Sequence, residues 1–144
     1  MNTKRKIAFG CYLLALLMIT SVALIYLATP QLLPYQEAAI GKTWSELDLG
    51  VQVQFWSLLK VAGGGYLTTA ISLAILLFIP FRKKENWARW AIPSIGIPAM
   101  LVVNYAGLNI ISKTPGRPPL IAGPIVIFLL IVGLIFSAER SGRI

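Results

Sequence analysis

The sequence predicts an all-α integral membrane protein: a four-helix bundle with an amphipathic segment on its extracytoplasmic face. Three observations predict this fold class. Four long apolar stretches occupy most of the 144 residues, 57% of the residues are hydrophobic and only 12% are charged, and positive charge gathers at alternate joints. A soluble domain averages about 25% charged residues. We therefore expect residues 1–144 to form one transmembrane domain.

The predicted spans cover residues 7–29, 55–81, 91–111 and 120–138. Each is about 19 to 27 residues long, and a helix needs roughly 20 apolar residues to cross the hydrocarbon core. The first span follows a basic segment, as a signal peptide would. Its apolar run is too long for a cleaved signal, so we expect an uncleaved anchor.

Positive charge is distributed unevenly between the two predicted sides of the membrane. On one side lie nine of the 13 basic residues: Lys4, Arg5, Lys6, Arg82, Lys83, Lys84, Arg89, Arg140 and Arg143. Lys42, Lys60, Lys113 and Arg117 fall on or toward the other side. Because basic residues collect on the cytoplasmic side of spans, we expect both termini in the cytoplasm. The same rule accounts for the net charge of +8, so we expect no nucleic-acid partner.

The joint between the first two predicted spans is the longest. Pro30 and Pro34 stop the first helix, since proline has no amide donor. Residues 43–46 have the form of a capping box, which predicts a helix beginning near Trp44. We expect this amphipathic segment either to lie at the membrane interface or to continue into the second span, with Gly50 as a bend.

The second span carries small residues at every fourth position, Gly64, Thr68 and Ser72. Such a stripe lets two membrane helices approach closely, and the partner helix could belong to this chain or to another. A homodimer through the stripe is one such arrangement. The span is predicted to close at Pro80.

The third and fourth spans are predicted to be antiparallel neighbours. The joint between them, residues 113–119, is short and rich in proline. Pro93 and Pro98 are expected to kink the third helix. Trp87 and Trp90 precede it and are typical anchors at a membrane interface.

Several kinds of chemistry are excluded by composition. The chain has no histidine and a single cysteine, Cys11, so His-ligated metals, imidazole bases and Cys-x-x-Cys redox pairs are absent. We expect no cofactor and no metal. Small four-span multidrug exporters have a similar architecture, but they depend on a carboxylate in the first span, where this chain has none.

Lys60 is the most conspicuous polar residue, because it lies a few turns inside the outer end of the second span. One interpretation is that its ammonium reaches out to the lipid headgroups. Another is that it faces the bundle and binds an anionic or carbonyl-bearing ligand. A third is an ion pair with Glu37, Glu46 or Asp48.

Polar residues of the third span reach about the same depth as Lys60. Their amides could simply hydrogen-bond to a neighbouring span. The alternative is a ligand pocket under the outer loop, with a lid formed by loop residues. The candidate ligand-binding residues are Lys60, Asn104, Tyr105, Asn109, Tyr35, Glu37 and Trp44.

Three classes of function follow. The sequence favours a non-catalytic membrane protein, either a binder of a small or lipidic ligand or an accessory subunit, that acts through its outer half. The alternatives are a small transporter or channel subunit and, with less support, an enzyme that modifies a lipid or quinone. No residue is assigned to catalysis, because general acid–base work needs tuned groups within reach of each other. The candidate partners are membrane lipids, a second copy of the chain and another membrane protein.

A set of short motifs resembles small, uncharacterised bacterial four-span proteins, loosely of the DoxX-like group. The motifs are Pro34-Tyr35, Gly41, Trp44, Leu47, the run from Lys60 to Gly65, the run from Ile79 to Arg82, Trp87 to Trp90, and Thr114-Pro115 with Pro118-Pro119. The resemblance implies a four-helix bundle in a bacterial inner membrane and no catalytic residue. Such proteins often carry a histidine after the Pro-Tyr pair. This chain has Gln36 there, which puts a metal or proton role at that position in doubt.

Overall fold

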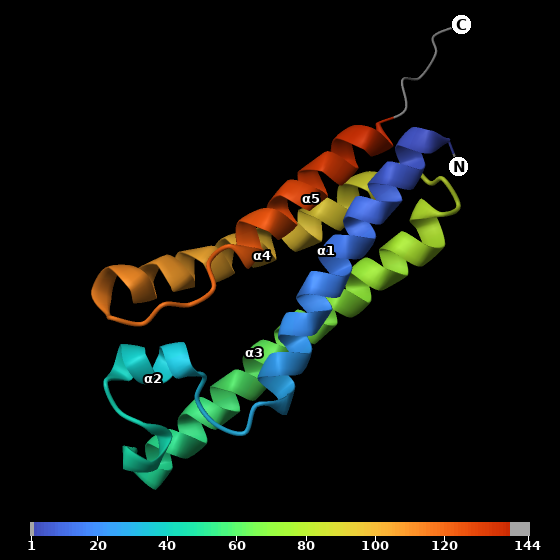
Figure 1. The fold of residues 1–144 in the computed structure, drawn as a ribbon. Helices are drawn as coiled ribbons and strands as arrows, with labels where there is room; N and C mark the ends of the chain where they lie inside the picture. Colours follow the sequence, from blue (N-terminus) through green and yellow to red (C-terminus); the bar gives the residue numbers. More distant parts are fainter. Residues whose placement is uncertain (1, 139–144) are drawn as a thin grey trace, which may run out of the picture.

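A computed structural model describes residues 2–138 of the protein (Figure 1). Every regular element in this range is a helix and no strand is present, which confirms the predicted all-α fold class. The elements are α1 (Thr3–Ala28), α2 (Pro34–Ile40), the 3₁₀ helix η1 (Trp44–Glu46), α3 (Leu49–Leu76), the π-helix η2 (Leu77–Phe81), α4 (Ala88–Lys113) and α5 (Ala122–Ser137).

Three of these helices are long and apolar enough to cross a membrane, namely Thr3–Ala28, Leu49–Phe81 and Ala88–Lys113. The fourth predicted span corresponds to α5, which has only 16 residues. At 1.5 Å per residue it is about 24 Å long, against about 30 Å for the hydrocarbon core. Length and composition therefore support three full spans and one shorter apolar helix.

The loop after α1 is more structured than the sequence predicts. α1 ends at Ala28, just before Pro30, but Pro34 begins a helix of its own instead of only ending the previous one. Proline suits the first position of a helix, because the amide it lacks would have no intrahelical partner there. This helix, α2, ends at Gly41 in the left-handed conformation, with φ of 75°.

The predicted capping box forms, but the helix it starts is only one turn long. The Thr43 amide donates to the Glu46 carboxylate over 2.7 Å. The turn then ends at Leu47, whose backbone is extended, and the long helix α3 begins at Leu49. The expectation of a continuous helix from Trp44 is therefore wrong. Gly50 lies in the first turn of α3, so it is not a bend between two helical segments.

From Leu49 onward the chain runs directly into the second predicted span. Leu49–Phe81 comprises 33 residues, which corresponds to about 50 Å of helix. Near its end the helix widens into the π-turns of η2 around Pro80, which cannot donate a backbone hydrogen bond. The helix ends at Phe81, which is also the last residue of the predicted span 55–81.

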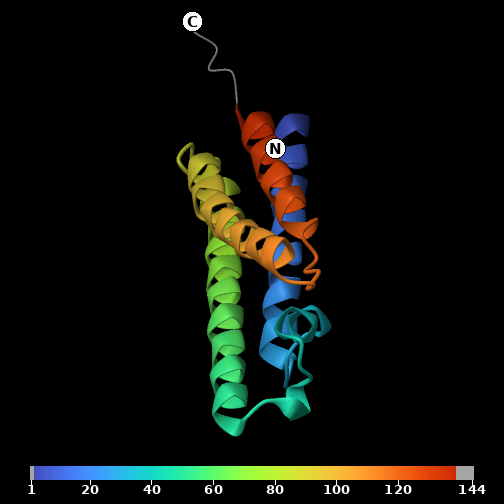
Figure 2. The same ribbon diagram turned by 90° about the vertical axis from the view of Figure 1, so that its left-hand side faces the viewer.

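α1 is the central helix of the bundle. It packs along α3 on one side and α5 on another, and α4 packs against α5. Figure 2 shows α5 beside the first half of α1, while α1 and α3 run alongside each other over most of their length. The largest fully buried side chains are Tyr12, Phe81, Ile19, Leu73, Leu77, Ile92, Leu130 and Val126.

The helices do not stay together along their whole length. α3 and α4 lie close where the short turn joins them and then diverge toward their other ends (Figure 1). α2 lies on the diverging side, where a Cβ added to Gly116 in the α4–α5 loop would come within 2.6 Å of the Tyr35 carbonyl. α2 therefore bridges the end of α1 and the α4–α5 loop.

We expect Gly133→Ala to destabilise the fold. A Cβ at Gly133 would lie 2.4 Å from Cε1 of the buried Tyr12 ring, so α5 would have to move away from α1. Overpacking of this kind costs about 1–3 kcal/mol. Thermal unfolding in detergent measures the effect, and the midpoint should fall.

Gly10→Ala is the matched control, because a Cβ at Gly10 on α1 would meet nothing within 4 Å. Alanine favours a helix over glycine by up to about 1 kcal/mol, so the control midpoint should stay or rise. Equal midpoints for the two variants would contradict the close α1–α5 approach.

Candidate functional site

Lys60 of α3 points at the last turn of α1. Its ammonium nitrogen donates to the carbonyl oxygens of Leu27 and Thr29, both at 2.6 Å, and lies 3.3 Å from that of Tyr26. The same nitrogen lies 5.3 Å from the centroid of the Trp56 ring. The lysine is thus a side-chain cap on a neighbouring helix.

This contact has a clear physical reason. The last four carbonyls of a helix have no amide donor inside the helix, and they carry the negative end of the helix dipole, which a cation stabilises. An ammonium has three N–H donors, and three carbonyls receive them here. No donor of Lys60 is left for a ligand in this arrangement.

None of the three interpretations of Lys60 from sequence describes this contact. The ammonium is directed into the protein, toward backbone oxygens. Two of its proposed acidic partners have other donors: Glu37 accepts the Trp44 amide at 2.8 Å, and Glu46 accepts the Thr43 amide. The interaction that satisfies Lys60 is a helix cap, which sequence spacing does not reveal.

A second cation makes the reciprocal contact at the other end of the same helix pair. Arg5 of α1 is only 4% exposed. Its Nη2 donates to the Phe81 carbonyl at 2.8 Å, and its guanidinium carbon lies 4.7 Å from the centroid of the Phe81 ring. Phe81 ends η2, so Arg5 caps α3–η2 as Lys60 caps α1.

In the sequence, Arg5 is one of three consecutive basic residues that predict the orientation of the chain. A signal for its burial was present. Arg5 shares a helical face with Ala8, Tyr12 and Ala15, all of them buried. Lys4 and Lys6 fall outside that face and are exposed.

Three tyrosines surround the α1 cap. The hydroxyls of Tyr26 on α1 and Tyr35 on α2 are 2.7 Å apart, and the rings of Tyr26 and Tyr66 on α3 have centroids 5.6 Å apart. Burial raises the pKa of Tyr35, and its hydrogen bond with Tyr26 raises it further. Tyr35 therefore stays neutral and ties α2 to the end of α1.

The α4 residues of the predicted pocket turn in different directions. Asn104 packs against α5, where its amide oxygen would lie 2.3 Å from a Cβ added to Gly123. Tyr105 is 71% exposed. Asn109 is half-buried, and its amide donates to the Tyr105 carbonyl of its own helix at 3.0 Å.

The seven candidate residues thus separate into two groups. Lys60, Tyr35, Glu37 and Trp44 belong to the assembly around the ends of α1 and α2. The three residues of α4 lie on a helix that diverges from α3 on this side (Figure 1). Counting residues placed them at similar depth, but it could not give the rotation of α4 or its divergence.

One shallow pocket does involve a predicted residue. It has a volume of about 140 Å³ and is lined by Trp44, Leu49, Gln52, Val53 and Trp56. Ligand pockets usually measure about 300–1,000 Å³. The Gln52 side chain is committed to the Trp44 and Leu47 carbonyls at 2.8 and 3.0 Å. This pocket is too small to hold a drug-sized ligand.

The small-residue stripe on α3 lies on its outward side. A Cβ at Gly64 would meet nothing within 4 Å, and the hydroxyls of Thr68 and Ser72 donate to carbonyls of their own helix. The close approach to α1 is made by the neighbouring Gly63, where a Cβ would lie 3.1 Å from the Leu27 amide nitrogen. Contact of the stripe with another molecule stays a prediction.

The described residues contain no group of three or more His, Cys, Asp or Glu side chains that could hold a metal ion. Comparison of the chain with protein-family models, with curated proteins and with solved structures gives no match. The site must therefore be interpreted from its own geometry.

We expect Lys60→Met to lower the thermal stability of the protein in detergent. Methionine keeps an apolar stem but leaves the Leu27 and Thr29 carbonyls without their donor. An unsatisfied buried acceptor costs about 1–3 kcal/mol. Lys113→Met is the control, because Lys113 is exposed in the last turn of α4. If both variants melt at the wild-type temperature, the cap contributes nothing to stability. The interpretation in which the Lys60 ammonium reaches the lipid headgroups would then be favoured.

The η1 turn should open on acidification. The Thr43 amide, and secondarily its hydroxyl, hold the pKa of Glu46 below its ordinary value. A lowered pKa means that the carboxylate stabilises the turn at neutral pH, and that this contribution is lost as the pH falls from the ordinary value through the lowered one. In an NMR titration, the chemical shift of the Thr43 amide should change as the Glu46 carboxylate is protonated, and the midpoint of that change should lie below the ordinary pKa of a glutamate. Glu46→Gln should abolish the transition, and a midpoint at or above the ordinary value would contradict the capping bond.

Proposed function

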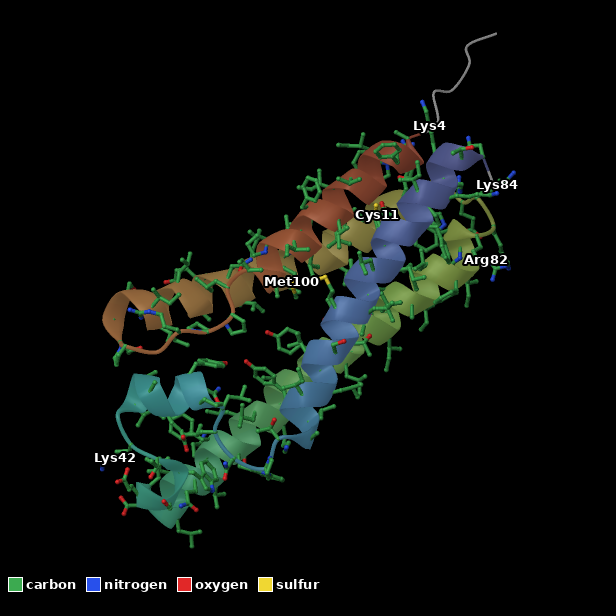
Figure 3. All side chains as sticks on the ribbon, viewed as in Figure 1. Lys4, Cys11, Lys42, Arg82, Lys84 and Met100 are labelled. Carbon is green, nitrogen blue, oxygen red and sulfur yellow. The ribbon has the colours of Figure 1, made fainter. Side chains whose placement is uncertain are left out.

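We propose that the protein is a four-span protein of a bacterial inner membrane, a single domain with both termini in the cytoplasm. The three long apolar helices support the membrane assignment, and α5 fits as a short fourth span if the bilayer thins locally around it. Lys4, Arg82 and Lys84 lie at one end of the bundle and Lys42 at the other (Figure 3), which supports the orientation through the positive-inside rule. Two basic residues used for that prediction, Arg140 and Arg143, lie outside the described residues. The DoxX-like resemblance is part of this proposal.

The function we propose is binding without catalysis, through the outer half of the molecule. The ligand is a lipidic molecule with a polar headgroup, or a helix of another membrane protein. The observation that carries the proposal is the outward face of α4. There Tyr105, at 71% exposure, lies one turn after the apolar Leu101, and the apolar Leu108 and the half-buried Asn109 follow on the next turn; Leu101 and Leu108 are 55% and 58% exposed.

Such a face is unusual for a helix that contacts only lipid chains. Hydrocarbon offers no hydrogen-bond partner, so polar groups at membrane depth normally find one in protein, water or a ligand. The Asn109 amide donates one hydrogen bond, to its own helix, whereas an amide side chain can take part in about four. Tyr105 and Asn109 are four residues apart and share a face, so one polar group can engage both.

The rest of the outer half supports binding over chemistry. The three ammonium donors of Lys60 are directed at the end of α1, and the Tyr35 hydroxyl is bonded to Tyr26. A lipid- or quinone-modifying reaction was predicted to use Lys60 and Tyr105, and of these two only Tyr105 is left accessible. The apolar spans also contain no carboxylate of the kind that carries protons in small exporters.

Replacement of Tyr105 by the photo-crosslinker p-benzoylphenylalanine tests this function. Illumination of membranes should give a discrete adduct, identified by mass spectrometry as one lipid class or one partner protein. Replacement of Leu24 is the control, because Leu24 is 57% exposed near the corresponding end of α1. The same mixture of bulk lipids at both positions would overturn the proposal.

The polar groups themselves are tested by Tyr105→Leu with Asn109→Leu. Tyr105 is exposed, and the half-buried Asn109 side chain bonds to its own helix, so we expect the double variant to fold as the wild type does. We expect native mass spectrometry to show one co-purifying molecule on the wild type and none on the double variant. Retention of the same molecule in the double variant would show that this face does not hold it.

A further inference from the structure

The end of the bundle opposite the α1 cap carries a dense positive charge. Figure 3 places Lys4, Arg82 and Lys84 at this end, and Arg5, Lys6, Lys83 and Arg89 are their neighbours in the sequence. The only acid in the turn between η2 and α4 is Glu85, and it accepts a hydrogen bond from the Trp87 indole nitrogen. Within residues 2–138, the turn from Arg82 to Lys84 therefore carries three positive charges beside a single carboxylate.

Arg89 differs from the other basic residues at this end. Its side chain is partly buried, and its Nε is enclosed by protein atoms with no hydrogen-bond acceptor among residues 2–138. Its guanidinium carbon lies 5.4 Å from the centroid of the Trp90 ring. The Arg89 carbonyl, in contrast, is used, because it accepts the Tyr12 hydroxyl at 3.2 Å.

The backbone of Arg89 is thus tied to α1, while its guanidinium is positioned without an acceptor in the described part of the chain. A guanidinium matches the oxygens of a phosphate, with which it forms charge-assisted and often bidentate hydrogen bonds. The Nε atom itself is enclosed by protein, so an anionic group from outside would meet the terminal Nη groups of the same guanidinium. A charge-assisted hydrogen bond to such an anion is stronger than one between neutral groups.

Two indoles indicate where that group would come from. Trp87 and Trp90 are 54% and 56% exposed, on either side of Arg89. Exposed tryptophans next to an apolar helix lie at the level of the lipid headgroups. Lys83 and Lys84, exposed in the preceding turn, add positive charge at the same level.

We propose that this end binds the headgroup of an anionic phospholipid, with the phosphate held by the Arg89 guanidinium and drawn in by the lysines and arginine of the 82–84 turn. This inference is independent of the proposed function, which concerns the other end of the molecule. A basic run that serves only to orient the chain during insertion would need neither the positioned guanidinium nor selectivity between lipids.

Quenching of tryptophan fluorescence by brominated lipids tests the proposal. The protein carries Trp44→Phe and Trp56→Phe, so that Trp87 and Trp90 are the reporters, and is reconstituted in phosphatidylcholine. Brominated phosphatidylglycerol is compared with brominated phosphatidylcholine at equal mole fraction. We expect the anionic lipid to bind at least about fivefold more strongly, which corresponds to the attraction of one basic residue near an anionic surface.

Three variants show which residues give the selectivity for phosphatidylglycerol over phosphatidylcholine. Arg89→Gln should lower it several-fold. Arg82→Gln with Lys83→Gln and Lys84→Gln should lower it further. Lys42→Gln with Lys113→Gln and Arg117→Gln removes the same number of positive charges from exposed positions elsewhere on the molecule and should leave it unchanged.

The proposal would be overturned if the reporter protein, with all its charged residues intact, bound phosphatidylglycerol and phosphatidylcholine equally strongly. This measurement does not depend on the folding of any charge variant. An equal loss of selectivity in both triple variants would overturn it too, because only net charge would then matter. If Arg89→Gln keeps the wild-type selectivity for the anionic lipid, the Arg89 guanidinium does not bind the phosphate and the proposed site is wrong.

Discussion

The structure depends on satisfying the carbonyl groups at the ends of two long helices. Lipid offers no donor to these groups, so a helix that ends near the hydrocarbon needs donors from the protein. α1 and α3–η2 supply them to each other. Lys60 of α3 donates to the last carbonyls of α1, and Arg5 of α1 donates to the last carbonyl of η2. Because the caps lie at opposite ends of an antiparallel pair, together they set how far one helix can slide along the other.

The remaining helices build on this pair. Tyr12 of α1 stacks edge-on against Phe81, packs on Gly133 of α5, and donates to the Arg89 carbonyl at the start of α4. One side chain on the central helix therefore contacts all three of the others near the basic end. Nothing comparable holds α4 to α3 at its far end, where the two helices diverge (Figure 1). The long helices are thus packed on one another near the basic end, while at the other end α2 lies between the end of α1 and the α4–α5 loop (Figure 1).

Much of this fold could be predicted from sequence, because apolar length decides where helices lie and composition decides that they lie in a membrane. The capping box at Thr43 was also predictable, since it depends on residues three positions apart. Contacts between elements were not. The position of Lys60 in the chain gave its depth, but its partner is the end of another helix. Asn104 and Tyr105 are adjacent in sequence, yet one packs on α5 and the other is exposed, a difference that follows from the rotation of α4.

A charged residue in a membrane span is by default a candidate site, and a comparison of Lys60 with Arg5 and Arg89, which lie near the ends of helices, shows how that default should be refined. The useful comparison is between the donors a side chain carries and the acceptors the fold gives it. Lys60 has three N–H donors, and three backbone carbonyls of the protein accept them, so no donor is left for a ligand. Arg5 is buried against Phe81, and its guanidinium donates a hydrogen bond to the Phe81 carbonyl. Arg89 is held in place through its backbone and by Trp90, while no acceptor among the described residues meets its guanidinium. Of the three, it is the cation whose position and remaining donors fit a ligand from outside the chain.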